Sequence, residues 1–297
     1  MNIRELIKKG VETISSAFPE REAREMVLLY LEDVHGIKRL THILEPDAVV
    51  SADVAEKSLE AFASMASGQP IQYIIGKAHF YGRQFNVNPS VLIPRPETEV
   101  LCRKVINHHG RMHSLCPNPK ILDMCTGSGC IAWTLALEIP KAKVRAVDIS
   151  DGALDVAGSQ DFDQEMEQTG AAAPDFIKAD VLGEIPAEIA SSSYDIIVSN
   201  PPYVMDSEKV LMRANVLEHE PHLALFVPDN DPLLFYRAVA RWASRLLVPG
   251  GYGIVEINEA LGQQTAEVFR EAGFIGVEVV ADLNDRDRFV KFMQKFV

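Results

Sequence analysis

The stretch ILDMCTGSGCIA, residues 121–132, is the part of the sequence that decides the fold. An apolar run ends near Asp123, a turn with two glycines separated by one residue follows, and an apolar pattern resumes at Cys130. Glycines permit a tight turn and let a ligand touch the main chain, while the next helix presents unpaired N–H groups. We interpret the stretch as one wall of a nucleoside site; the alternative is a turn in which glycine serves chain geometry only.

Short apolar runs alternate with helical patterns over the chain that follows Pro119. This alternation is typical of an α/β fold with a mostly parallel, doubly wound sheet. Such sheets bind ligands beyond the carboxyl ends of their strands, so we expect the informative residues at those ends. The predicted strands are residues 120–124, 143–148, 175–180, 194–199 and 252–257.

The second and third of these strands end in acids that suit a nucleoside. Asp148 lies nineteen residues after Gly129, and a carboxylate at this spacing accepts hydrogen bonds from both ribose hydroxyls. The third strand ends at Asp180-Val181, where we expect the edge and face of an adenine. A dinucleotide remains a rival, because Gly127-x-Gly129-x-x-Ala132 fits its fingerprint loosely.

The fourth strand runs into NPPY, residues 200–203. Proline after Asn200 forces an extended conformation there, and the two prolines contribute carbonyls without competing N–H donors. A side-chain amide oxygen with the Pro201 carbonyl can hold both hydrogens of a planar –NH2 group, and Tyr203 can cover its flat face. We interpret this corner as a site that positions an amide or exocyclic amine, whose electrophile is an activated group such as a sulfonium methyl.

The first ninety residues differ in pattern from the rest. Apolar residues at helical spacing predict a helical bundle over residues 1–70, with Ser51 capping its third helix. Residues 71–90 suggest short strands and a β-hairpin connector. The larger domain then spans residues 91–297 and opens on the stiff elbow LIPRPETE, residues 92–99.

Composition excludes several classes of protein. The 297 residues are 24% charged and 47% apolar, as in an ordinary globular protein, and the net charge of −13 disfavours binding to a nucleic-acid backbone. Four cysteines form no C-x-x-C pair, the N-terminus has no secretory apolar region, and no run is long enough to span a bilayer. We expect a soluble cytoplasmic protein with reduced thiols.

Other polar clusters carry weaker signals. His108, His109, His113 and Cys116 have no recognised ligand spacing, so we expect no metal site. The stretch EHEPH, residues 218–222, either lines a substrate entrance or forms a solvated loop.

The sequence resembles the glutamine N(5)-methyltransferase family that acts on peptide chain release factors, over nearly its whole length. The resemblance is carried by the turn at residues 123–130, Asp148, the NPPY corner, the elbow at 92–99, Glu220-Pro221 and residues 286–288. It implies a Rossmann-like class I fold that uses S-adenosyl-L-methionine, yields S-adenosyl-L-homocysteine, and methylates the glutamine of the Gly-Gly-Gln motif in class-1 release factors. Nothing in the sequence demands more than a monomer.

The resemblance also implies residue roles. The methionine part of the cofactor would lie on the loop, the ribose on Asp148, and the adenine beside Val181, while Asn200 would border both cofactor and substrate. The loop residues are Cys125, Thr126, Gly127, Ser128 and Gly129, and the residues that would grip the glutamine amide are Asn200, Pro201, Pro202 and Tyr203. The sequence departs from the family in Cys125, where a first glycine is common, and in Val181, where an aromatic residue is common.

Rival functions remain open at this point. The same chemistry suits a glutamine of a ribosomal protein or the exocyclic amine of adenine. A nicotinamide oxidoreductase would use the glycine turn and Asp148 but leave the proline corner without a role, and a nucleoside-sensing module would bind without turnover. The helical domain is the expected docking surface for a protein substrate, because one glutamine cannot distinguish one protein from another.

Overall fold

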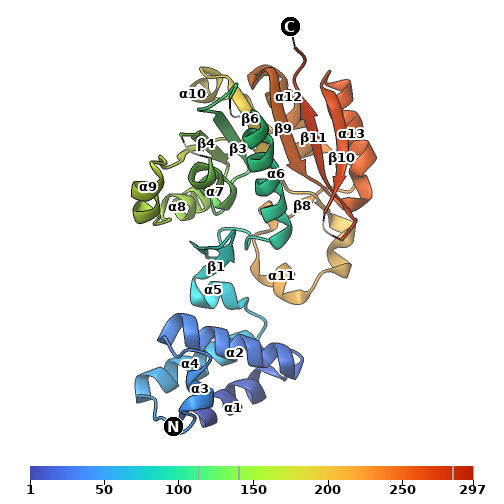
Figure 1. Cartoon of the computed structure of the whole chain (residues 1–297). Coiled ribbons are helices and arrows are strands. Elements are labelled where there is room, and N and C mark those ends of the chain that lie inside the picture. The colour runs from blue at the N-terminus through green and yellow to red at the C-terminus, as the bar shows by residue number, and fades with distance from the viewer. Residues whose placement is uncertain (113, 140, 283, 297) are drawn as a thin grey trace. The chain divides into compact units, whose positions relative to one another are not determined.

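The computed structural model describes residues 1–112, 114–139, 141–282 and 284–296 (Figure 1). The chain forms two compact units. The first contains residues 1–77 and 212–219, and the second contains residues 78–211 and 220–297.

The first unit is a bundle of helices, as the apolar spacing predicts. Its first helix begins with a capping box, in which Asn2 accepts from the Glu5 N–H at 2.8 Å and Glu5 accepts from the Asn2 N–H at 3.1 Å. One face of that helix is buried against the second and fourth helices. The helices are α1 (Ile3–Ile14), α2 (Glu20–His35), α3 (Thr41–Leu44), α4 (Ala52–Ala66), α5 (Ile71–Ile75) and α11 (Ala214–His219).

The strand character predicted at the start of the 71–90 segment is wrong. Residues 71–75 form helix α5, which follows Pro70 and ends at Gly76 in the left-handed conformation, φ 77°. Ile71, Ile74 and Ile75 are spaced as on one helical face and pack into the core of the bundle. The alternation of apolar residues had suggested a strand, but burial of this face favours a helix.

A β-hairpin does follow, over β1 (Lys77–Phe80) and β2 (Arg83–Asn86). Its two turn residues, Tyr81 and Gly82, both have positive φ, at 50° and 75°. Two successive positive values are the signature of a type I′ turn, which suits the twist of a hairpin. The boundary between the compact units falls after Lys77, inside the first strand.

A seven-stranded sheet forms the centre of the second unit, in the order β10-β11-β9-β6-β3-β4-β5. The strands from β9 to β5 are parallel, and β11 runs antiparallel to both β9 and β10. Their bounds are β3 (Lys120–Met124), β4 (Lys143–Asp148), β5 (Asp175–Lys178), β6 (Tyr194–Ser199), β9 (Leu247–Glu256), β10 (Ile275–Ala281) and β11 (Asp287–Met293).

Helices cover both faces of this sheet, as Figure 1 shows. One face packs on α6 and α7, and the other packs on α10, α12 and α13, because successive residues such as Ile121 and Leu122 point to opposite sides. The helices are α6 (Pro96–Met112), α7 (Cys130–Glu138), α8 (Asp151–Gly158), α9 (Asp163–Thr169), α10 (Ala187–Ala190), α12 (Leu234–Leu246) and α13 (Gly262–Glu271). Short β7 (Val204–Met205) pairs with β8 (Phe226–Val227), and 3₁₀ turns span Asp206–Leu211, His222–Ala224 and Glu259–Leu261.

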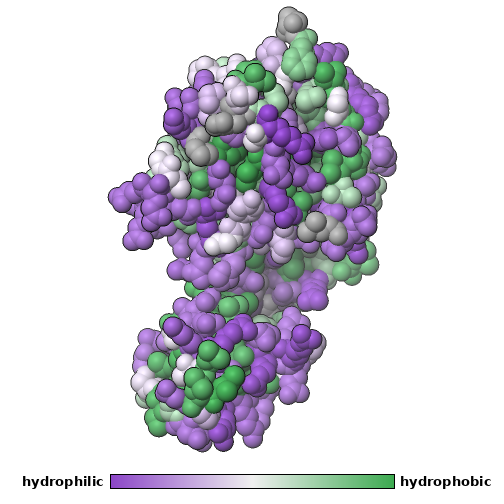
Figure 2. All heavy atoms as spheres, in the orientation of Figure 1, coloured by the Kyte–Doolittle hydropathy of each residue, from purple (hydrophilic) through white to green (hydrophobic). Residues whose placement is uncertain are grey.

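The parallel sheet confirms the predicted fold class, and its strand order explains where a ligand can bind. The chain moves outward from β3 to β4 and β5 and then returns to the opposite side of β3 with β6. This reversal leaves a crevice outside the carboxyl ends of β3 and β6, where such sheets bind ligands. No helix among the described residues is long and apolar enough to cross a membrane. Figure 2 shows hydrophilic residues over much of the visible surface, with hydrophobic ones exposed in places on the helical unit.

Candidate active site

Strand register brings three chain segments together at the carboxyl edge of the sheet. Met124 at the end of β3 pairs with Ser199 at the end of β6, and Ser199 pairs with Val255 near the end of β9. The Ser199 hydroxyl also donates to the Met124 carbonyl at 2.7 Å. The glycine turn, the NPPY corner and residue 256 therefore leave the sheet side by side.

A pocket lies at this edge, with about 1110 Å³ of space that includes its opening to solvent. The volume is of the order of a site for a ligand the size of a nucleoside conjugate, for which roughly 300–1,000 Å³ is usual. The predicted site residues that line it are Cys125, Thr126, Gly127, Ser128, Asp148, Val181, Asn200 and Pro202. Gly129, Pro201 and Tyr203 are not among the lining residues.

The glycine turn needs left-handed backbone at alternate positions. Cys125, Gly127 and Gly129 have φ of 61°, 55° and 78°. Nothing lies within 4 Å of the place a Cβ would take on Gly127, so its main chain is open to a ligand. A Cβ on Gly129 would lie 3.0 Å from the Ala157 Cβ, so this glycine instead permits the close approach of helix α8 to the turn. Cys125 also has left-handed backbone, although its β-carbon makes that conformation sterically unfavourable.

Asp123 supports the turn from inside the protein. Its side chain is fully buried and accepts a hydrogen bond from the Thr126 hydroxyl at 2.6 Å. Burial raises the pKa of the Asp123 carboxyl to about 7, against the opposing effect of the Thr126 hydrogen bond. Its second oxygen has no hydrogen-bond partner among the described residues.

The Asp148 carboxylate lines the pocket beside the glycine turn. One carboxylate oxygen accepts from the Gly127 N–H at 2.9 Å and the other from the Ser150 N–H at 3.0 Å. A carboxylate has about four lone-pair sites, so main-chain hydrogen bonds from Gly127, Ser150 and Ile149 still leave room for a ligand hydroxyl. Burial raises the pKa of Asp148, and these main-chain hydrogen bonds act in the opposite direction.

The far wall of the pocket is mainly apolar. Val181 is 4% exposed, and Leu182, Ile149 and Phe235 line the same space. The Val181 carbonyl accepts from the Arg241 guanidinium at 3.1 Å, which fixes the loop after β5. An apolar wall beside main-chain groups suits a flat heteroaromatic ring.

The structure places Asn200 in the pocket beside Thr98. The Asn200 Nδ2 donates to Thr98 Oγ1 at 3.2 Å, and Thr98 Oγ1 donates to Glu256 Oε2 at 2.8 Å. Thr98 and Glu256 are 2% and 1% exposed. Asn200 is thereby tied to a buried carboxyl on β9 through one hydroxyl.

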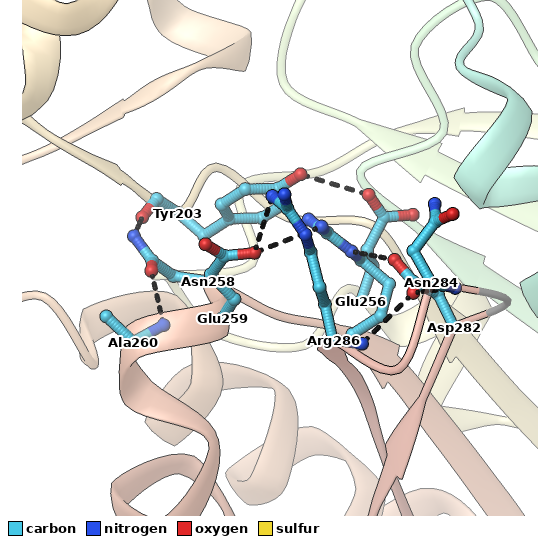
Figure 3. A network of polar contacts seen from close by, with 9 residues as sticks. Tyr203, Glu256, Asn258, Glu259, Ala260, Asp282, Asn284 and Arg286 are labelled. Carbon is cyan, nitrogen blue, oxygen red and sulfur yellow. Dashed lines mark hydrogen bonds and ion pairs between the residues drawn. The ribbon is translucent and has the colours of Figure 1, made fainter.

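Tyr203 is held away from the pocket. Its hydroxyl donates to Glu256 Oε1 at 3.0 Å, and its carbonyl accepts from Asn258 Nδ2 at 3.2 Å (Figure 3). Its ring packs beside the core on the α12 face of the sheet. Burial is the main cause that raises the pKa of the Tyr203 hydroxyl well above its usual value, and the nearby Glu256 raises it further. The hydroxyl therefore remains a donor.

The elbow at residues 92–99 forms another wall of the pocket. Arg95 pairs with the buried Glu220 at 2.5 Å, and the Ile93 N–H donates to the same carboxylate at 3.1 Å. Glu220 is therefore a structural anchor for the elbow. His219 lies on α11 in the helical unit, so the EHEPH stretch is divided between the two units.

Sequence reasoning assigned no role to four residues at this site. Arg95, Thr98 and Phe235 line the pocket, and Glu256 lies behind it. The elbow that holds Arg95 and Thr98 was recognised from its two prolines, but neither side chain was given a role at the site. Glu256 lies near the end of the last predicted strand, so the rule that directed attention to Asp148 could have identified it as well.

The cysteines and histidines form no competing centre in the described parts of the chain. Burial raises the pKa of the Cys130 thiol to about 12 and that of Cys125 well above its usual value, so neither is a ready nucleophile. His108 and His109 lie on α6, and His113 lies outside the described residues. No cluster of three or more His, Cys, Asp or Glu side chains within the described ranges could hold a metal ion.

Known proteins match both parts of the chain. Residues 5–76 match the PrmC N-terminal domain, and residues 103–223 match the methyltransferase small domain. Release factor glutamine methyltransferases from Flavobacterium psychrophilum and Bacteroides thetaiotaomicron are 41% and 39% identical over 281 and 279 residues, which cover 95% and 94% of this chain and 95% of each relative. The Chlorobaculum tepidum relative of the same name is 35% identical, with 95% of each chain covered.

These matches confirm the predicted methyltransferase fold and S-adenosyl-L-methionine as the cofactor. The site's own residues fit that cofactor. Gly127 leaves its main chain open, the Asp148 carboxylate could accept from a ribose hydroxyl, and Val181 belongs to an apolar wall against which an adenine would fit. With 35–41% identity over nearly the full length of three proteins of one name, and with this pocket at the switch point of the sheet, the chain belongs to the release factor glutamine methyltransferase family.

Proposed function

We propose that this enzyme methylates the side-chain amide nitrogen of the glutamine in the Gly-Gly-Gln motif of class-1 peptide chain release factors. The observation that carries the proposal is the position of Asn200, whose side chain lines the same pocket as the glycine turn and Asp148. An amide-recognising group therefore stands beside the cofactor residues. A plain nucleoside-binding module would have no need of it.

In the proposed complex, the glycine turn from Cys125 to Gly129 holds the methionine part of the cofactor, Asp148 the ribose, and Val181 the adenine. Asn200 Oδ1 and the Pro201 carbonyl accept the two amide hydrogens of the substrate glutamine. Pro202 lines the pocket and keeps the corner rigid, because its ring fixes φ. Tyr203 supports the corner through its hydroxyl bond to Glu256.

The cofactor supplies a methyl carbon on a positively charged sulfur. When bound, it would give up this methyl group to the glutamine nitrogen and leave as the neutral thioether S-adenosyl-L-homocysteine, while the proton of the methylated amide would pass to water. The protein contributes alignment of a weak nucleophile, for which proximity and orientation are the main source of acceleration. The acceptors at Asn200 and Pro201 also stabilise the positive charge that grows on nitrogen.

The helical domain of residues 1–70 is the part that we propose to dock the release factor. Its α3 region exposes apolar side chains, among them Leu40 at 65%, Ile43 at 64% and Leu44 at 75% exposure. Exposed apolar side chains close in sequence are a common feature of protein-binding surfaces. We further propose that the enzyme acts as a cytoplasmic monomer, without direct contact to nucleic acid.

Methyl transfer from radiolabelled cofactor tests this proposal. A purified class-1 release factor should accept label, and a variant with the Gly-Gly-Gln glutamine changed to alanine should not. A ribosomal protein and an adenine-containing oligonucleotide, supplied at equal concentration, should accept none. Labelling of either in preference to the release factor would overturn the proposed substrate.

A further inference from the structure

A buried carboxyl group lies directly behind the amide-binding corner. Glu256 ends β9, is 1% exposed, and accepts hydrogen bonds from Thr98 Oγ1 at 2.8 Å and from the Tyr203 hydroxyl at 3.0 Å. Thr98 lies in the first turn of α6 and is 2% exposed. Burying a carboxyl group costs free energy of folding, and the reaction proposed above does not use this one.

With Glu256 ionised, the donors and acceptors in this network have a fixed direction; burial raises the pKa of this carboxyl, and the hydrogen bonds from Thr98 and Tyr203 and the nearby Arg288 lower it. A hydroxyl has one proton, and Thr98 donates it to Glu256. Toward Asn200, the Thr98 oxygen can therefore only accept, so the group that faces it must be the NH2 of the Asn200 amide. The Asn200 carbonyl oxygen therefore lies at the opposite edge of the planar amide, away from Thr98.

In the opposite amide orientation, Asn200 could not accept a hydrogen bond from the substrate amide. With the amide turned over, its oxygen would face the lone pairs of Thr98, and its NH2 would meet the NH2 of a substrate glutamine, donor against donor. Only the observed orientation offers an acceptor for the substrate hydrogens. The orientation is set by an acceptor that is buried and cannot exchange its hydrogen-bond partners with water.

We propose that Thr98 and Glu256 are positioning residues, which fix the amide orientation of Asn200 so that its oxygen faces the glutamine nitrogen. This inference rests on the proposed function. Thr98 acts on Asn200 directly and Glu256 acts through Thr98, so their contributions to turnover are coupled. Tyr203 satisfies the second oxygen of Glu256 and keeps both carboxylate oxygens paired inside the protein.

Substitution of Thr98 by valine tests the idea, because valine keeps the shape and removes the hydroxyl. Thr98→Val should lower kcat for release-factor methylation roughly tenfold to a hundredfold, the usual effect of one lost buried hydrogen bond. The dissociation constant for S-adenosyl-L-methionine, measured by calorimetry, should change less than threefold. Thr98→Ser, which retains the hydroxyl, should restore most of the lost turnover.

A matched control and a double variant distinguish a positioning role from a general effect of changing a buried side chain. Thr134 is fully buried on α7, and its hydroxyl has no hydrogen-bond partner among the described residues, so Thr134→Val should leave kcat unchanged. Glu256→Gln should lower kcat by itself but have little further effect in the Thr98→Val background. Equal losses in the valine and serine variants, or losses at Thr98 and Glu256 that multiply, would overturn the inference.

A readout without substrate distinguishes this inference from the proposed function. In ¹⁵N-labelled protein, the side-chain NH2 signal of Asn200, assigned by its disappearance in Asn200→Ala, should exchange slowly with solvent in the wild type and fast in Thr98→Val. Unchanged exchange would contradict the positioning role even if the release factor is methylated. Slow exchange in a wild type that methylates no release factor would instead count against the proposed function alone. If Thr98→Val does not fold, Glu256→Gln serves for both measurements.

Discussion

The two glycines of the cofactor turn should fail in different ways when each is changed to alanine. Gly129 is buried, has φ of 78°, and a Cβ there would lie 3.0 Å from Ala157 Cβ and 3.2 Å from the rings of Phe176 and Trp133. Left-handed backbone costs an alanine about 1–2 kcal/mol, and overpacking adds about 1–3 kcal/mol. Gly129→Ala should therefore lower the free energy of unfolding by about 2–5 kcal/mol, out of the roughly 5–15 kcal/mol of a typical domain.

Gly127 provides the matched control. Its φ is 55°, but no atom lies within 4 Å of the added Cβ, so Gly127→Ala should cost only the backbone strain of about 1–2 kcal/mol. The new methyl group would stand in the pocket, so the variant should lose cofactor affinity instead. Urea unfolding monitored by circular dichroism and cofactor titration by calorimetry measure the two effects. Equal destabilisation by both alanines would refute the packing role assigned to Gly129.

Other consequences concern charge, the amide corner and docking. The pKa of Asp123 is raised to about 7 in the folded protein, so ionisation of this carboxyl destabilises the fold. The free energy of unfolding should fall by roughly 1.4 kcal/mol per pH unit from about pH 4 to 7. Asp123→Asn should remove this slope in urea unfolding measured across pH. Arg95→Met removes the guanidinium partner of the buried Glu220 carboxylate, so we expect a loss of about 1–3 kcal/mol of unfolding free energy. Glu220→Gln should partly restore it, and no restoration would exclude the ion pair as the cause. Asn200→Ala should lower turnover far more than cofactor affinity, and equal losses would contradict its role at the substrate. Ile43→Ser should raise KM for the intact release factor and leave a short Gly-Gly-Gln peptide unaffected, whereas equal effects on both substrates would argue against docking by α3.

Much of the fold follows from local pattern. The predicted strands at 120–124, 143–148 and 194–199 have the observed bounds, because buried parallel strands form short apolar runs flanked by polar turns. The antiparallel pair β10 and β11 was not predicted, since its exposed edge gives a weaker pattern. Helix α5 was missed because five residues hold too little periodicity to separate a helix from a strand.

Site residues could be predicted where each lies at or just after the carboxyl end of a single predicted strand. Asp148, Val181 and Asn200 all line the pocket, as the rule for carboxyl ends of parallel strands leads one to expect. The network behind Asn200 was not predictable in this way, because Thr98 and Glu256 are 158 positions apart in the sequence. Their contact depends on the register of β9 and the placement of α6, which no local pattern specifies.

Tyr203 shows why residue type alone is not enough to assign a role. An aromatic ring after Asn-Pro-Pro suggests a cover for the substrate amide. A buried phenol must find a hydrogen-bond partner, however, and Glu256 provides it on the side away from the pocket. The side chain is therefore part of the support of the corner in this structure.

Location of the transferred methyl group tests the central claim most directly. The release factor would be incubated with enzyme and a cofactor that carries a deuterated methyl group, then digested and sequenced by tandem mass spectrometry. We predict that the added mass falls on the glutamine of the Gly-Gly-Gln peptide and is absent with Asn200→Ala. A methyl group on any other residue, or undiminished labelling of that glutamine by the Asn200 variant, would contradict the account.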